Sequence, residues 1–155
     1  MAALTDARLG EIPLGPDGYG EALLGVGPWV IRITVDGGPE TSEPVDLCGE
    51  DPVGLLGRAA RWAAAPGHET VDLFLDHHLS EFAPDELEAI AGERAPEGVE
   101  GLRAVLQPIA AHFATDASGG RQLAVDVGFG PDITEVVLVV EVDPEGQPLS
   151  VDAES

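Results

Sequence analysis

The stretch that decides the fold is TEVVLVVEVD, residues 134–143, which holds five consecutive aliphatic side chains at positions 136–140. A continuous apolar run of this length is typical of a central strand that is covered on both faces or nearly so. The Asp-Pro-Glu-Gly sequence at 143–146 predicts a type I turn after it. Residues 148–153 then predict a strand that returns beside the first.

Two further strands are predicted before this run. Large apolar side chains occupy every second position of one of them, which indicates a strand with one buried face: Leu123, Val125, Val127 and Phe129. The other begins at Ile109 and contains His112 and Phe113. Glycine-rich or proline-containing turns are predicted at 116–120 and 130–132.

The N-terminal part predicts strands as well. In Trp29–Asp36 the apolar residues Trp29, Ile31, Ile33 and Val35 alternate with polar ones, so one face of this strand is expected to be buried. Residues 1–26 are rich in glycine and proline and predict an irregular edge strand or two. A loop is predicted at 39–49.

Helices are predicted between these two groups of strands. Asp51 and Pro52 are typical of a helix start, and Pro66-Gly67 of a stop. A second helix is predicted at 69–82, a short third helix from Pro84, and a fourth within 97–107. The order indicates an α+β fold: a largely antiparallel β-sheet with three to four helices inserted between N-terminal and C-terminal strands.

The length of 155 residues suits a single α+β domain over 1–155. Cys48 is the only cysteine, so no internal disulfide can form, and a cytoplasmic location is expected. The sequence has no apolar stretch of membrane-spanning length and no secretory leader pattern at its start.

The charge is strongly acidic, with 29 Asp and Glu residues against seven arginines, no lysine, and a formal net charge of −22. Residues 1–77 hold 13 acids and residues 78–155 hold 16, so the acidity belongs to the whole chain. Binding to nucleic acid or to an anionic membrane is disfavoured because both need a basic patch. Two interpretations stay open: a solvated surface that reflects host composition, or an acidic face that docks a basic partner.

The only cluster with metal-ligand chemistry lies in the predicted second helix. Asp76, His77 and Glu81 could form a weak metal or proton-transfer site, with His112 as a further ligand from elsewhere. Adjacent histidines cannot converge on one ion from a regular helix, so His77 and Glu81 are more simply read as a surface pair. His78 lies on the apolar stripe and is expected to be a core histidine with a hydrogen bond.

No catalytic residue and no cofactor-binding residue is predicted. The sequence contains no phosphate-binding glycine loop that joins a strand to a helix, no GxSxG and no CxxC. His112 and His68 are each expected to be structural or solvated. Cys48 lies beside Glu50 and Asp51, where negative charge disfavours a thiolate.

The C-terminal stretch resembles a bacterial family catalogued as domain of unknown function 2004. The resemblance rests on a strand Asp, an Asp-aliphatic-Thr turn, an aliphatic strand, an acidic glycine turn and a Glu-Ser ending: Asp126, 132–134, 136–142, 143–146 and 154–155. The His-His-Leu at 77–79 is similar to the middle part of that family, whereas Val127 stands where an aromatic residue is often found. The resemblance implies a small cytoplasmic bacterial protein and brings no catalytic residues.

These observations favour a non-enzymatic protein-binding domain, immunity-like or inhibitor-like, whose partner is a basic protein. One alternative is a metal-dependent hydrolase or metal-binding protein centred on the second helix, with Asp76, His77, Glu81 and His112 converging in a cleft. Another is a structural homodimer module in which an edge strand pairs between copies. The oligomeric state and the strand order are left open.

Overall fold

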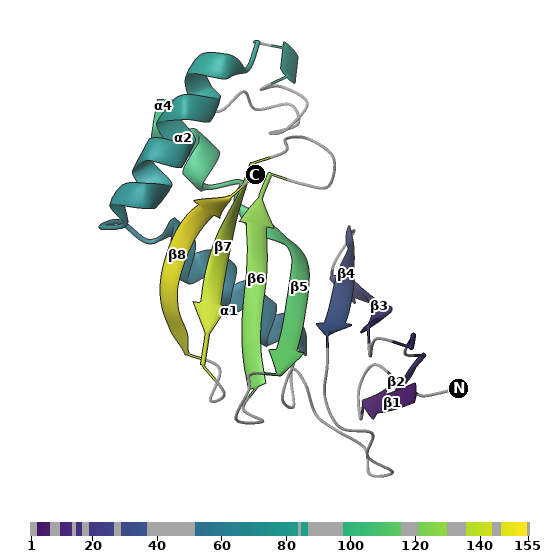
Figure 1. Cartoon of the computed structure of the whole chain (residues 1–155). Coiled ribbons are helices and arrows are strands. Elements are labelled where there is room, and N and C mark those ends of the chain that lie inside the picture. The colour runs from purple at the N-terminus through teal and green to yellow at the C-terminus, as the bar shows by residue number, and fades with distance from the viewer. Residues whose placement is uncertain are drawn as a thin grey trace.

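A computed structural model gives the fold of the chain (Figure 1). The structure describes residues 3–6, 10–13, 15–16, 19–26, 29–36, 52–83, 85–86, 98–115, 121–129, 136–143 and 147–154. The predicted loop at 39–49, Cys48, the Asp51 cap and the turns at 116–120, 130–132 and 144–146 lie outside these residues. Within the described part of the chain, no helix is both long enough and apolar enough to cross a membrane.

Six strands form one sheet in the order β3-β4-β5-β6-β7-β8. They are β3 (Tyr19–Val26), β4 (Trp29–Asp36), β5 (Gln107–Thr115), β6 (Arg121–Gly128), β7 (Val137–Val142) and β8 (Pro148–Glu154). Neighbouring strands are antiparallel except for β4 and β5, which are parallel. Parallel neighbours need a long crossover connection, and here the helices are part of it.

The described helices are α1 (Pro52–Ala64), α2 (Glu69–Glu81) and α4 (Gly98–Arg103). The predicted α+β fold with a largely antiparallel sheet and helices between two groups of strands is therefore confirmed. The fourth predicted helix corresponds to α4. For the predicted third helix, Asp85 and Glu86 are helical and the residues after them lie outside the described part.

The predicted N-terminal edge strand is β3, at one edge of the sheet. A separate two-stranded antiparallel sheet precedes it, formed by β1 (Ala3–Asp6) and β2 (Gly10–Pro13). The turn between α1 and α2 contains Gly67 at a φ of 107°. This conformation favours glycine, which explains why Pro66-Gly67 is an effective stop signal.

One face of the sheet forms the core with the helices. α1 lies behind β5 to β8 in the view of Figure 1, and α2 and α4 lie together near one end of the sheet. Alternate strand residues point into this core and are buried: Ile31, Ile33, Ala111, Phe113, Leu123, Val125, Val127, Leu138, Val140 and Val142. Each large aliphatic side chain buried in this way contributes about 1.5–3 kcal/mol to stability.

The prediction that residues 134–143 form a central strand covered on both faces or nearly so is confirmed for one face and met only in part on the other. β7 is an interior strand, second from the edge, and Leu138, Val140 and Val142 are buried. The alternate side chains, however, are partly buried at Val137 and Val139 and exposed at Glu141. β-branched residues fit a strand on either face, so a run of valines does not by itself require a second covering layer.

Candidate functional site

The structure does not bring the four predicted metal ligands together. Asp76, His77 and Glu81 are exposed on α2, which packs against the core face of the sheet. His112 lies on β5 between the core residues Ala111 and Phe113, so its side chain points to the opposite face. In the part of the chain that the structure describes, no group of three or more His, Cys, Asp or Glu side chains is placed to hold a metal ion.

His78 is a core histidine, as predicted. It is 3% exposed, and its Nδ1 lies 2.7 Å from the Phe74 carbonyl oxygen, to which it donates. Its ring also packs on Phe74, Phe82 and Phe129. Burial lowers the pKa of His78 below the ordinary 6.5, because a charged imidazolium loses its hydration there.

We use the name open face for the side of the six-stranded sheet that points away from the helices. The strand register aligns its side chains in two neighbouring rows that each cross all six strands. One row contains Glu21, Thr34, His112, Ala124, Glu141 and Ser150. The other contains Leu23, Arg32, Ala110, Asp126, Val139 and Asp152.

A chain of hydrogen bonds joins three adjacent strands at the centre of the open face. Thr34 Oγ1 on β4 lies 2.6 Å from Nδ1 of His112 on β5. His112 Nε2 lies 2.9 Å from Oδ2 of Asp126 on β6. Thr34 is the direct neighbour of His112 in the register, and Asp126 is a diagonal neighbour within side-chain reach. We call these three residues the relay.

The chemistry of the partners assigns the protons of the relay. A carboxylate can only accept, so Nε2 of His112 donates to Asp126. In the neutral ring Nδ1 then carries the lone pair and accepts from the Thr34 hydroxyl. The hydrogen bond to Asp126 and its negative charge raise the pKa of His112 above 6.5, against the opposing effects of burial and of the Arg32 charge.

The order hydroxyl, imidazole, carboxylate is also that of a nucleophile, a general base and the acid that orients it. Acyl transfer needs, in addition, preorganised donors for the developing oxyanion. The relay lies on β4, β5 and β6, and each of these strands is paired with a neighbour on both sides. Their backbone amides are therefore used in the hydrogen bonds between strands. Thr34 is also only 7% exposed. The burial of Thr34 leaves its hydroxyl little access to a substrate, and what the geometry shows is three side chains joined by two hydrogen bonds.

The surroundings of the relay differ on its two sides. Toward β7 and β8 the open face carries exposed carboxylates on Glu141, Asp152 and Glu154. Toward β3 and β4 it carries Leu23 and Val30, which are 72% and 60% exposed. Arg32, on β4, lies 4.0 Å from Glu21 on β3. The open face thus combines an acidic side with an exposed apolar side.

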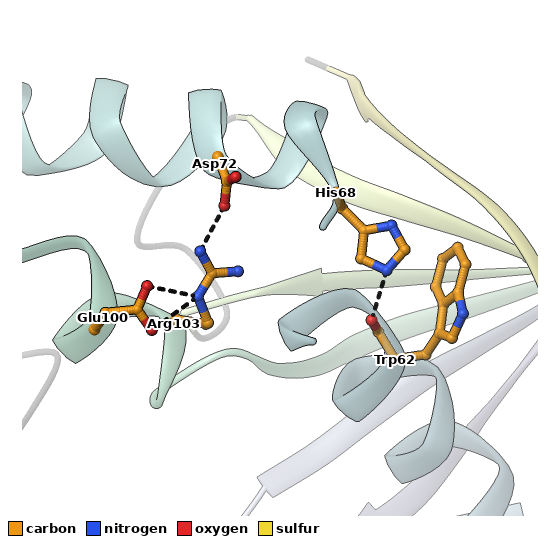
Figure 2. A network of polar contacts seen from close by, with 5 residues as sticks. All are labelled: Trp62, His68, Asp72, Glu100 and Arg103. Carbon is orange, nitrogen blue, oxygen red and sulfur yellow. Dashed lines mark hydrogen bonds and ion pairs between the residues drawn. The ribbon is translucent and has the colours of Figure 1, made fainter. Parts of the chain in front are cut away.

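A second polar network lies among the helices and is structural (Figure 2). Arg103 of α4 reaches Asp72 of α2 through Nη2 and Glu100 through Nε, and its side chain is 11% exposed. The bond to Asp72 is the main cause of the raised pKa of Arg103. His68 Nε2 donates to the Trp62 carbonyl oxygen at 2.9 Å, which joins the ends of α1 and α2. These contacts hold the helices to one another.

Sequence reasoning named one member of the relay as a possible site residue and missed the combination. His112 is predicted with a set of partners that the structure does not bring to it, and Asp126 is quoted for the family resemblance without a predicted role. The usable signal was the alternation of buried and outward-facing residues along each strand. Thr34, His112 and Asp126 all occupy positions between core residues, so all three face away from the core. Alternation gives the face of each residue but not its neighbour on the next strand.

No family model, curated protein or solved structure matches this chain. The resemblance to the domain of unknown function 2004 family therefore stays a hypothesis that rests on the residues quoted for it.

Proposed function

We propose that this chain is a non-enzymatic cytoplasmic bacterial domain that binds a basic protein through its open face. An immunity-like or inhibitor-like role, in which the acidic domain occupies a basic surface of its partner, is the most concrete form of this proposal. The observation that carries it is the composition of the open face, which has exposed carboxylates toward β7 and β8 and exposed apolar side chains toward β3 and β4.

The proposal is supported by the position of this face, which no described helix contacts. The described helices contact the core side of the sheet, and the open face is turned toward the viewer in Figure 1. Leu23 and Val30 expose most of their surface there, and burying such side chains is a main source of binding free energy. A sheet of six paired strands can also accept a partner with little rearrangement of its backbone.

The partner's chemistry follows from charge. With a net charge of −22 the chain repels other acidic proteins and a second copy of itself, whereas a basic protein is attracted from a distance and oriented on approach. We therefore expect the partner to place Lys or Arg side chains over β7 and β8 and apolar side chains over β3 and β4.

The test compares two double charge reversals that change the net charge equally. Glu141→Lys with Asp152→Lys alters the open face, and Asp76→Lys with Glu81→Lys alters the exposed side of α2. A protein captured from a lysate of the native host is identified, purified and titrated against the full chain and both variants. We expect the open-face variant to weaken binding at least about tenfold and the α2 variant less than about twofold.

Three results would contradict the proposal: no protein is captured at low salt, the captured protein is acidic, or the two variants weaken binding equally. Equal weakening would mean that only the overall charge matters and that the open face has no special part in binding. Circular dichroism of both variants checks that the fold is retained.

A further inference from the structure

We propose that the relay of Thr34, His112 and Asp126 is a proton-operated gate on the open face, an inference that rests on the proposed function. With a neutral imidazole, Asp126 contributes its charge to the acidic side of the face and a basic partner docks. When the imidazole takes up a proton, it offsets that charge and docking weakens.

The geometry lets the gate change charge without changing contacts. In the neutral state His112 donates to Asp126 from Nε2 and accepts from the Thr34 hydroxyl at Nδ1. In the protonated state both nitrogens donate, and the Thr34 oxygen accepts, because a hydroxyl can do either. Both hydrogen bonds therefore exist in both states, so protonation of His112 requires no movement of the strands.

The charged groups around His112 set the direction of the effect. On the open face these are Glu21 from β3, Arg32 from β4, Asp126 from β6 and Glu141 from β7. Of these four charged groups, Asp126 is hydrogen-bonded to the ring at 2.9 Å, and its effect on the pKa of His112 outweighs the opposing charge of Arg32. A partner cation seated near Asp126 would meet an added positive charge as soon as His112 is protonated.

The solvent access of His112 and the direction of its pKa shift both suit a gate that responds to protons. The His112 side chain is 43% exposed, so solvent can deliver and remove the proton, whereas that of Asp126 is 18% exposed, so its charge is only partly screened by water. Because the pKa of His112 lies above 6.5, the imidazole takes up its proton at a higher pH than an isolated histidine does. One added unit charge near a docked cation corresponds to about a three- to tenfold change in the affinity for the partner.

By linkage, docking and protonation oppose each other. If a protonated His112 weakens docking, a docked cation must lower the pKa of His112 by the same free energy. This reciprocal effect can be measured on the full chain with a defined probe, an oligolysine peptide, before any natural partner is known.

The first experiment follows the ring signals of the four histidines by NMR from about pH 5.5 to about pH 8.5, with and without oligolysine. We expect the peptide to lower the pKa of His112 clearly and to change the ring signals of His77, exposed on α2, much less. Asp126→Asn should lower the pKa of His112 in the free chain. An unchanged pKa of His112, or equal shifts at His77 and His112, would overturn the gate.

The second experiment measures the dissociation constant of the purified partner over the same pH range. The wild-type chain should bind about three- to tenfold more weakly at the acidic end, His77→Gln should behave in the same way, and His112→Gln should lose this pH dependence. If the open-face charge reversal abolishes binding but wild type and His112→Gln share one pH profile, the gate fails while the proposed function stands. If the charge reversal has no effect, the proposed function itself fails.

Discussion

At the scale of single residues, two histidines show how environment decides the behaviour of one side-chain type. His78 points into the core among aromatic rings, where burial lowers its pKa. His112 points to the open face beside Asp126, whose hydrogen bond raises its pKa. Acid therefore acts on the two in opposite directions: it favours the folded state through His112 and disfavours it through His78.

The first prediction concerns the effect of His78 on the free energy of unfolding at mildly acidic pH. Its folded pKa lies below the unfolded value of about 6.5, so below that pH the unfolded chain binds more protons and the free energy of unfolding falls. His78→Leu removes this loss. Between about pH 7.5 and about pH 5.5, the wild type should lose roughly 1 kcal/mol more stability than the variant in urea unfolding.

The comparison isolates His78 because His112, with its opposite sign, is present in both proteins. A hydrophobic replacement also leaves no orphaned acceptor, since the Phe74 carbonyl lies within a helix and keeps its backbone partner. Identical pH slopes for the two proteins would show that His78 does not titrate differently in the folded and unfolded chains.

At the scale of elements, aromatic rings attach α2 to the rest of the fold. Phe129, just beyond the end of β6, lies 5.5 Å from Phe74 and 5.8 Å from Phe82 between ring centroids. Its side chain is 2% exposed, so it fills a close-packed space between the helix and the sheet.

We expect Phe129→Ala to cost about 3–5 kcal/mol of unfolding free energy, through lost burial and the cavity that remains. Phe129→Leu, which refills most of that volume, should cost clearly less. The matched control is Leu73→Ala on the exposed side of α2, which should cost less than about 0.5 kcal/mol. Urea unfolding measures all three, and a Phe129→Ala cost close to that of Leu73→Ala would show that this contact does not hold α2.

The elements themselves were largely predictable. Helix periodicity gave α1 and α2, and alternation gave β4 and β6, because both patterns depend only on local backbone geometry. The covering of β7 was predicted only in part, since what lies on the far face of a strand depends on the placement of distant helices. The predicted edge strand is present as β3. The sequence of residues 1–26 did not indicate that β1 and β2 form a separate sheet.

At the scale of the whole molecule, the net charge of −22 has a consequence for stability. Closely spaced carboxylates repel one another more in the compact state than in the unfolded chain. Salt shortens the range of this repulsion, from about 20 Å in dilute buffer to about 4 Å in 0.5 M salt.

Raising the NaCl concentration from about 0.02 M to about 0.5 M should therefore raise the thermal unfolding midpoint, by about 3–6 °C for a domain of this size. Scanning calorimetry measures the shift. The open-face variant with Glu141→Lys and Asp152→Lys carries less net negative charge and should gain less from salt. A midpoint that stays constant or falls with salt would mean that self-repulsion is not a significant part of the stability.

The sequence by itself determined the α+β fold class, the positions of the three helices α1, α2 and α4, the buried side of most strands and the acidity of the whole chain. These properties are local or additive, so they can be read from periodicity and composition. Only the tertiary structure decided that Thr34 and His112, 78 positions apart, are direct neighbours and that Asp126 completes the relay. Strand register and helix placement result from packing across the whole core, and no short stretch of sequence specifies them.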